Sequence, residues 1–521
     1  MADLNEERAN ENETTKKMGS IPIICGCPRN RVGLLAGVVV SFFRLLISQG
    51  LKLVTWYFGQ AHEHWWLLIV WVLISLGLTL ILGRWLKQTP DIKGSGIPQV
   101  EGQLMGELDY HWWPVLWKKF VGGVIAIGSG LFLGREGPSI QLGATVGQGF
   151  AAKRHLTGVD RRIIIASGAS AGLSAAFNAP IASSLFVLEE VYHNFSTMVW
   201  ITALASAIAA DFVSTVFFGL TPVLHITYLR ALPLSQYGWL LLLGVLLGLL
   251  GRLYQIVVLR VGSWYSKLKW LPDDYNSIIA FVLLIPIGWF IPQILGGGNS
   301  LIVSIGGNAP TALVLLLIFV LRFIYSMMAY GTGLPGGVFL PILTLGAVFG
   351  GFFSQLMVTW GLMPAAEVPI FVIAAMAGYF AGISKAPFTA ILLITEMVGT
   401  LHHLMPLAIV SLVAYMTVDI LGGAPVYAAM LDRLLQHRQQ TQTTPLKQIS
   451  FPVFVESSLA GKQVREVNWP QGALLVELQR GEKVLIPHGD TIIRVGDLLV
   501  LNVESRTLRA VRQAMKQLVG D

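Results

Sequence analysis

Apolar runs of membrane length recur along most of this chain. A helix that spans a bilayer needs about 20 consecutive apolar residues. Only 12% of the 521 residues are charged and 54% are hydrophobic, whereas soluble proteins carry about a quarter charged residues. The sequence therefore predicts a mainly α-helical, polytopic membrane protein and not a large soluble enzyme. The runs lie at about residues 33–57, 64–86, 112–133, 197–219, 236–262, 277–294, 311–329, 338–360, 367–382 and 404–421.

Shorter apolar segments lie between these runs and cannot cross a bilayer as single helices. Several of them open with glycine or proline, and the chain holds 55 Gly and 24 Pro. Broken or re-entrant helices occur at membrane depth only where they line a cavity or are buried in protein. We therefore expect an interior site built from helix ends. These segments are 95–105, 138–150, 163–177, 181–191 and 387–398.

The two halves of the apolar region resemble each other. Residues 142–147 (LGATVG) are similar to residues 345–350 (LGAVFG), and residues 171–180 are similar to residues 381–387. A glutamate follows at a matching place in each half, Glu189 and Glu396, and the match predicts a structural role for both. Repeats with interrupted helices are typical of secondary transporters, whose binding site lies where the halves meet. We predict two inverted repeats, at about 33–220 and 234–422.

Residues 134–139 (GREGPS) end the apolar run that begins near residue 120. A carboxylate there is costly unless it has a function. Gly134 and Gly137 give backbone freedom and Pro138 suits a first helical turn, so Glu136 should lie at a helix N-terminus, where N–H groups attract anions. An ionised Glu136 can occupy an anion site, and a protonated one can leave it. Glu136 is thus a candidate gate; the alternative is a plain structural partner of Arg135.

The ends of the chain are polar. Residues 1–30 read as a cytoplasmic tail without a cleavable signal peptide, and its Cys25 and Cys27 are too few for a disulfide framework. Basic residues beside apolar runs, such as Arg161 and Arg162, indicate cytoplasmic segments. Both termini are therefore expected in the cytoplasm, with the protein in the cell (inner or plasma) membrane. The net charge of +7 is modest and does not call for a nucleic-acid partner.

The character of the sequence changes after residue 436. Residues 437–448 form a polar linker, and residues 449–521 predict a small soluble α+β domain. Gly481-Glu482 and residues 495–497 mark turns, and Ser505 is the expected N-cap of a helix over 505–518. Strands are expected at 452–456, 473–478, 483–486, 491–494 and 498–503.

Four stretches stand out along the apolar region: 94–98 (GSGIP), 134–138 (GREGP), 336–341 (GGVFLP) and the tyrosine that ends 423–427 (GAPVY). Together they resemble the CLC chloride channel and transporter family, over about residues 30–436. The resemblance implies a transmembrane domain at 31–436, no enzymatic activity, no cofactor, chloride as the bound substrate, and a homodimer in the lipid bilayer. Serine at position 95 fits a preference for chloride within the family.

By resemblance, Ser95, Val338, Phe339 and Tyr427 form the central chloride site. Two hydroxyls and two backbone N–H groups are neutral donors, which suit an anion that must be released again. Each residue also has a plain alternative. Ser95 could simply cap a helix, Tyr427 could be an interfacial anchor, and Val338 and Phe339 could be packing residues. Lys119 either raises the local potential for anions or snorkels to the interface.

Glu190 decides between the two behaviours of the family. By resemblance it matches the intracellular proton-transfer glutamate of the exchanger branch, which implies a proton-coupled chloride antiporter gated by Glu136. The alternatives are a passive voltage- or proton-gated chloride channel, or a sensor whose membrane body serves the C-terminal domain. Glu190 itself could instead form a surface salt bridge. The sequence leaves stoichiometry, rate and physiological role open.

The C-terminal domain lacks the paired repeats of CBS modules. Residues 473–478, 486–491 and 495–499 instead resemble the C-terminal module of RCK/TrkA potassium-uptake regulators. The resemblance leaves two roles open, the binding of a small regulatory ligand such as a nucleotide and the bracing of a dimer. The lone His488 lies in a predicted turn and is expected to be structural rather than a metal ligand.

Overall fold

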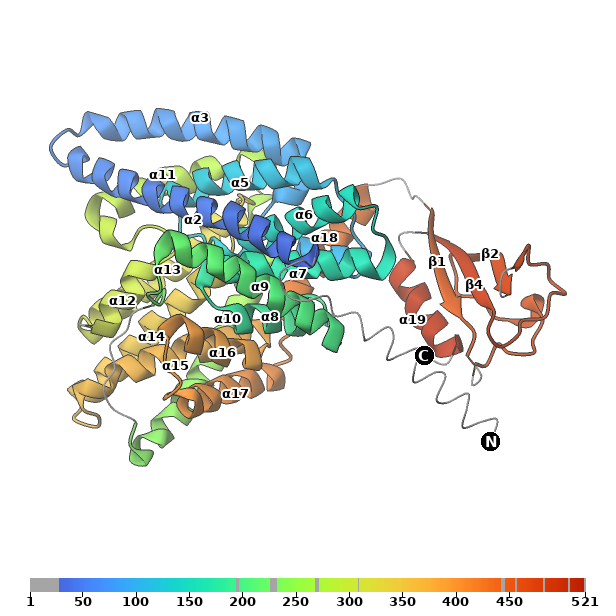
Figure 1. Ribbon diagram of the computed structural model, residues 1–521. Helices are drawn as coiled ribbons and strands as arrows, with labels where there is room; N and C mark the ends of the chain where they lie inside the picture. Colours follow the sequence, from blue (N-terminus) through green and yellow to red (C-terminus); the bar gives the residue numbers. More distant parts are fainter. Residues whose placement is uncertain are drawn as a thin grey trace. The chain divides into compact units, whose positions relative to one another are not determined.

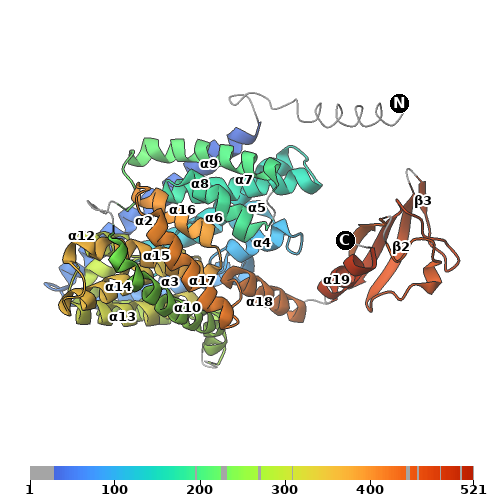
Figure 2. The same ribbon diagram turned by 90° about the horizontal axis from the view of Figure 1, so that it is seen from below.

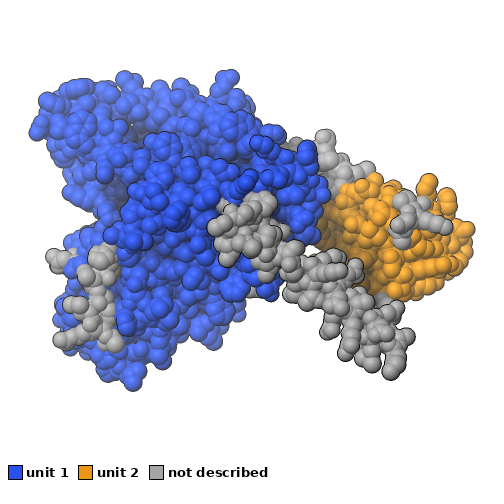
Figure 3. Space-filling view, viewed as in Figure 1, with its two compact units in different colours: residues 1–431 blue, residues 432–521 orange. Residues whose placement is uncertain are grey.

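The chain divides into two compact units, Met1–Leu431 and Asp432–Asp521 (Figure 3). A computed structural model describes residues 28–193, 196–224, 232–267, 271–307, 309–441, 446–454, 457–480, 483–504 and 507–519. Residues 1–27 with Cys25 and Cys27, the expected turn at 481–482 and the expected N-cap Ser505 lie outside these ranges. The two units are described separately below.

The first unit is built from helices, as predicted (Figure 1). Eight helices in the described part of the chain are long and apolar enough to cross a membrane. The predicted runs at 112–133 and 404–421 form helices of 17 residues each, the lower end of spanning length. The helices are α2 (Pro28–Ala61), α3 (Trp66–Gln88), α4 (Ile97–Leu104), α5 (Trp112–Gly128), α6 (Glu136–Lys153), α7 (Gly158–Phe177), α8 (Pro180–Phe186), α9 (Thr197–Phe218), α10 (Tyr237–Tyr265), α11 (Ser277–Phe290), α12 (Asn299–Gly307), α13 (Ala312–Gly331), α14 (Phe339–Thr359), α15 (Val368–Ser384), α16 (Pro387–Val398), α17 (Leu404–Ile420) and α18 (Val426–Thr441).

The same local chemistry breaks a helix in each half. Helix α7 ends at Asn178 with φ of 54°, and α15 ends at Lys385 with φ of 62°. A left-handed residue stops a helix, and a proline suits the first turn of the next one. Accordingly α8 starts at Pro180 and α16 at Pro387. The matching helices α6 to α8 and α14 to α16 thus occupy matching places in the two repeats.

Two matched glutamates join the halves. In the first half, Glu189 Oε2 accepts hydrogen bonds from the backbone N–H of Thr389 (2.9 Å) and from its hydroxyl (2.7 Å), at the start of α16. In the second half, Glu396 accepts from the backbone N–H groups of Ile181 (3.2 Å) and Ala182 (2.8 Å), at the start of α8. Helices α8 and α16 lie side by side (Figure 2). Each glutamate therefore caps the short helix of the opposite half, which agrees with the structural role that their matching positions suggest.

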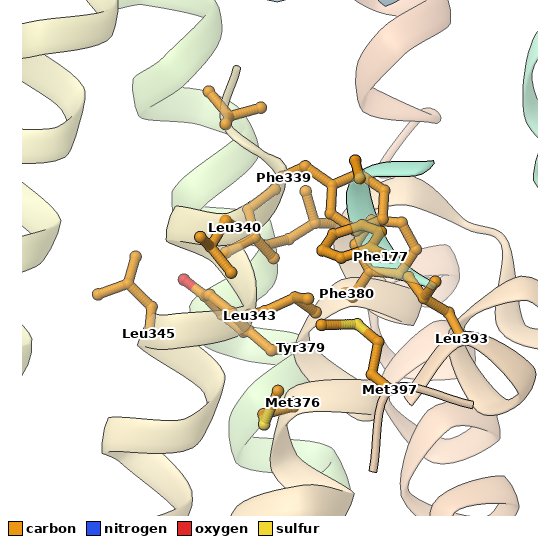
Figure 4. Close-up of a cluster of buried hydrophobic side chains, with 14 of the residues drawn as sticks. Phe177, Phe339, Leu340, Leu343, Leu345, Met376, Tyr379, Phe380, Leu393 and Met397 are labelled. Carbon is orange, nitrogen blue, oxygen red and sulfur yellow. The ribbon is translucent and has the colours of Figure 1, made fainter. Parts of the chain in front are cut away.

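A buried aromatic core lies where α7, α14 and α15 meet (Figure 4). The ring of Phe339 lies 5.3 Å from Phe177 and 4.4 Å from Phe380, between ring centroids. All three side chains are fully buried. The first residue of α14 is therefore held by packing from both repeats.

In its described residues, the second unit contains the end of α18, a four-stranded antiparallel sheet in the order β1-β4-β2-β3, and the helix α19 (Leu508–Val519) (Figure 1). The domain is α+β, as predicted. Buried side chains of the helix, Val511 and Met515, belong to the same core as those of the sheet. The strands are β1 (Leu446–Pro452), β2 (Ala473–Arg480), β3 (Lys483–Leu485) and β4 (Leu498–Glu504).

Two expected strands differ from the structure. Residues 491–494 form no strand. The segment beside them in space begins the 3-10 helix η7 (Val464–Glu466), so only an isolated bridge, between Gln463 and Ile492, is formed. The first strand lies at Leu446–Pro452 instead of 452–456, because those residues pair in register with all of β4. Helix α18 continues through Thr441, so the first part of the expected linker 437–448 is helical, and residues 442–445 lie outside the described ranges.

A partly buried ion pair links β2 to the turn before β4. Arg480 donates from Nε to Asp497 Oδ1 and from Nη2 to Oδ2, both at 2.8 Å, and the backbone N–H of Arg494 donates to Oδ2 at 2.7 Å. Burial alone would raise the pKa of the Asp497 carboxyl, but these hydrogen bonds and the two arginine charges outweigh it and hold the pKa below its usual value. The ionised carboxylate therefore stabilises this domain.

Asp497→Asn should destabilise the C-terminal domain by about 2 kcal/mol, because it removes charge-assisted hydrogen bonds. Since the folded pKa is lowered, the contribution is fully present above the unfolded pKa of about 3.9 and is lost as the pH falls through the folded value. Hydrogen exchange of amides 446–519 in the full-length protein, between about pH 6 and pH 3, measures this. Asp490→Asn, at an exposed turn, is the matched control. Equal protection in the two variants would contradict the prediction.

Candidate functional site

The first candidate, Glu136, is the first residue of α6 and is fully buried. A Cβ added to Gly134 would lie 2.6 Å from Glu136 Oε2 and 3.0 Å from the backbone nitrogen of Leu340. The carboxyl group therefore folds back over Gly134 and reaches the N-terminus of α14. Neither carboxyl oxygen has a hydrogen-bond partner among the described residues.

Arg135 does not fix this carboxyl group. Its Nε lies 3.7 Å from Glu136 Oε1, which is beyond hydrogen-bond distance. The two charges attract each other, but no hydrogen bond joins them. The reading of Glu136 as a plain structural partner of Arg135 therefore has weak geometric support.

The matching motifs of the two repeats meet beside Glu136. Gly134 and Gly337 exchange backbone hydrogen bonds of 2.7 Å in both directions. This antiparallel bridge brings the N-terminus of α6 next to that of α14, where Val338 and Phe339 lie. Two helix N-termini thus converge on one point, and each carries partial positive charge.

Ser95 lies just before α4, and its hydroxyl packs against the first turn of α6. A Cβ on Gly137 would lie 2.3 Å from Ser95 Oγ, so only glycine allows this approach. The side chain of Ser95 is buried, and its hydroxyl has no hydrogen-bond partner in the described part of the chain. Ser95 and the start of α6 are therefore brought together as the sequence predicts.

Tyr427 is fully buried, and its hydroxyl also has no partner among the described residues. Phe186, the last residue of α8, lies between Tyr427 and Phe339, with ring centroids 6.2 Å and 5.8 Å away. The reading of Tyr427 as an interfacial anchor is wrong, because the ring is not at a surface. Phe186 was missed by the sequence reasoning, and its position just before a glutamate pair gave no signal of this contact.

Glu190 lies on a π-helical turn, η2 (Val187–Val191), and is 3% exposed. Its Oε1 has no hydrogen-bond partner within the described residues, so the alternative of a surface salt bridge is wrong. Its neighbour Glu189 caps α16, so the two adjacent carboxylates occupy different environments. π-turns are frequent at functional sites.

The sequence reasoning missed a second buried carboxylate near Glu190. Glu101, in α4, is 1% exposed, lies within electrostatic range of Glu190, and has its Oε1 3.5 Å from His193 Nε2. A lone carboxylate within the short segment 95–105 was the available signal.

Lys119 is fully buried and does not snorkel to an interface. Its ammonium group donates to the carbonyl oxygens of Ile92 (3.0 Å) and Gly94 (2.7 Å). It therefore braces the loop that carries Ser95.

Comparison with known proteins agrees with this geometry. Residues 77–419 match the model of the voltage gated chloride channel family, which is well over half of the chain. The chain belongs to this family. Residues 449–516 match the TrkA-C domain, so the resemblance of the C-terminal domain is confirmed.

Relatives in the family are named as exchangers. The H(+)/Cl(-) exchange transporter ClcA of Vibrio cholerae is 36% identical over 427 residues, which cover 79% of this chain and 90% of the relative. That of Klebsiella pneumoniae is 32% identical over 431 residues, 80% of this chain and 90% of the relative. Among solved structures, a slow cyanobacterial Cl−/H+ antiporter is 29% identical with a TM-score of 0.75, covering 80% of this chain and 99% of that one. A CLC-type fluoride/proton antiporter is 22% identical with a TM-score of 0.63, covering 75% and 94%; this match shows the fold alone.

A cavity of about 740 Å³ opens beside the buried carboxyl group of this CLC family member. Arg135 and Leu340, both next to Glu136, line it together with Lys52 and Asn299. The cavity carries two positive side chains, which favour anions. Within the described residues, no cluster of three or more His, Cys, Asp or Glu side chains could hold a metal ion.

Proposed function

We propose that this protein is a proton-coupled chloride antiporter in which Glu136 is both gate and proton carrier. The observation that carries the proposal is the fully buried Glu136 carboxyl group, which folds back over Gly134 beside the N-terminus of α14. An ionised carboxylate is attracted to the same helix ends as a chloride ion. A proton removes that attraction. The names of the relatives, H(+)/Cl(-) exchange transporters, support the same reaction.

Chloride binds at Ser95, Val338, Phe339 and Tyr427 in this proposal. The two hydroxyl groups are buried without partners, and such a group costs about 1–3 kcal/mol unless a ligand accepts its hydrogen bond. Val338 and Phe339 contribute backbone N–H groups at the start of α14. The donors carry no full charge, which allows release. Chloride is the substrate, and the scheme uses no cofactor and no covalent chemistry.

Protons reach Glu136 from the other side through Glu190. Glu190 is buried in the same unit, and its carboxyl group interacts electrostatically with that of Glu101. Coupling follows because Glu136 leaves the anion site only when it carries a proton, and returns only when chloride is displaced. We further propose a homodimer in the cell membrane with both termini in the cytoplasm, and domain boundaries at 31–436 and 449–521.

The test is transport by the purified full-length protein in proteoliposomes, with chloride and protons recorded together. We expect an imposed chloride gradient to drive protons in the opposite direction against their own gradient. Chloride flux with no proton movement would support the passive channel, the second candidate, and would overturn the antiporter.

Removing the buried hydroxyl groups should weaken chloride binding. Ser95→Ala or Tyr427→Phe each deletes one hydrogen bond to a charged ligand, which corresponds to an affinity loss of about tenfold or more. Chloride titration by isothermal calorimetry in detergent measures the loss. Tyr415→Phe, on α17, is the control. Wild-type affinity in both site variants would remove these residues from the chloride site.

Deleting residues 440–521 should leave basal chloride flux intact, because the helix ends and buried groups of the proposed pathway all lie in the first unit. The comparison of truncated and full-length protein in the same vesicles measures this. If flux disappears while the truncated protein still elutes as a single folded species, the membrane body depends on the C-terminal domain, as the sensor hypothesis requires.

A further inference from the structure

A second polar pocket lies at the end of α4 that is opposite Ser95. It has a volume of about 210 Å³ and is lined by the last turn of α4, the loop after it and the start of α7. None of the residues proposed for transport lines it. Its lining residues are Gln103, Gly106, Leu108, Asp109, Gly158, Arg161, Arg162 and Ile165.

Gln103 is the residue that requires an explanation. It is 5% exposed, lines the pocket, and neither its Nε2 nor its Oε1 has a hydrogen-bond partner among the described residues. A buried amide with two free N–H donors is costly. A ligand in the pocket would satisfy it.

The charges of the pocket favour an anion. Arg161 is paired with Asp109 at 2.7 Å, so these two charges offset each other. The guanidinium of Arg162 lies beside Gly106, with Nη2 3.3 Å from the place of an added Cβ, and the described part of the chain offers it no ion pair. One positive charge therefore lines the pocket in excess. The other acidic groups close by in sequence are Asp160, in the first turn of α7, and Glu107, which has an interaction of its own.

The third donor is the N-terminus of α7. This helix has 20 residues, and Gly158, its first residue, lines the pocket. The free N–H groups of a first helical turn point at anions. A helix end and a guanidinium, both from α7, and an amide from α4 thus approach one space. Donors from several directions suit an anion with several oxygens rather than a single halide ion.

We propose that this pocket binds a phosphate group, carried either by a free phosphate compound or by the headgroup of an anionic lipid. Arg162 supplies the charge, Gln103 an amide N–H, and the start of α7 backbone N–H groups. The site is separate from the chloride pathway, so its existence does not depend on the proposed transport function.

The test uses the full-length protein in a neutral detergent at saturating chloride, which keeps the central anion site filled. One arm titrates inorganic phosphate, and the other titrates short-chain phosphatidic acid against phosphatidylcholine of equal chain length. The readout is the thermal unfolding midpoint, which rises with ligand concentration according to affinity. Stabilisation by phosphate identifies a free compound, and stabilisation by phosphatidic acid alone identifies a lipid; either result supports the site.

Variants locate the binding. Arg162→Gln and Gln103→Leu should each lower the affinity for the stabilising probe by about tenfold or more. Lys153→Gln, which removes an exposed charge outside the lining, should leave that affinity unchanged. Arg162 is exposed, so its variant tests the site even if Gln103→Leu impairs folding. The proposal is overturned if neither probe stabilises the wild-type protein, or if Arg162→Gln binds the probe as tightly as the wild type does. It is also overturned if Lys153→Gln lowers the affinity as much as Arg162→Gln does.

Discussion

Glu136→Gln should abolish proton movement while chloride still flows. Glutamine has the size of glutamate but cannot ionise, so it can neither carry a proton nor be drawn as an anion to the N-terminus of α14. A positioned proton-transfer group contributes about 100-fold or more in rate, and we expect proton flux driven by a chloride gradient to fall by at least that factor. Chloride flux should persist, because the buried donors Ser95 and Tyr427 are unchanged.

Proteoliposomes with both ions recorded measure this result. Glu63→Gln, which changes an exposed carboxylate between α2 and α3, is the control and should pump protons normally. Proton pumping that survives in Glu136→Gln would show that the buried carboxyl group is not the proton carrier, and the proposed coupling would have to be abandoned.

Glu190→Gln should also abolish proton movement, and chloride flux should persist. Glu190 is buried on the π-turn and is not one of the proposed chloride ligands, so its loss should break the proton route while the hydrogen-bond donors for chloride stay in place. The same assay should show proton flux lower by about 100-fold or more and chloride flux close to that of the wild type.

The adjacent glutamate provides a matched control. Glu189→Gln removes the same charge one residue away, but Glu189 caps α16 through Thr389. We expect lower stability, by about 1–2 kcal/mol, with proton coupling retained. If Glu189→Gln uncouples transport and Glu190→Gln does not, the two roles are reversed.

Local chemistry made much of the membrane fold predictable. Glycine and proline in residues 134–138 determine where α6 begins, and the left-handed ends at Asn178 and Lys385 are followed by prolines that start the next helices. The position of Glu136 at a helix N-terminus could therefore be predicted from neighbouring residues alone. The family resemblance then added Ser95, Val338, Phe339 and Tyr427, which no local rule would have grouped.

Contacts between distant segments could not be predicted. The ring of Phe186 lies beside those of Phe339 and Tyr427, which are more than 150 residues away in the chain. Nothing in the sequence near Phe186 indicates these contacts. The sequence left two interpretations of Lys119 open, an attraction for anions or a position at the membrane interface. The structure instead shows it buried, with its ammonium group donating to two backbone carbonyl groups. The prediction of a strand at 491–494 was wrong because a strand needs a long enough partner. The segment beside it forms the short helix η7 at residues 464–466 instead.

The crosswise capping by Glu189 and Glu396 limits how this protein can move. Rocking one repeat against the other as a rigid body would break both sets of charge-assisted hydrogen bonds and the bridge between Gly134 and Gly337 at the same time. Each hydrogen bond to a charged group is worth about 1.5–3 kcal/mol, so the repeats behave as one interlocked frame. In the proposed antiporter, access would then alternate through small displacements inside a stationary scaffold, such as a swing of the Glu136 side chain.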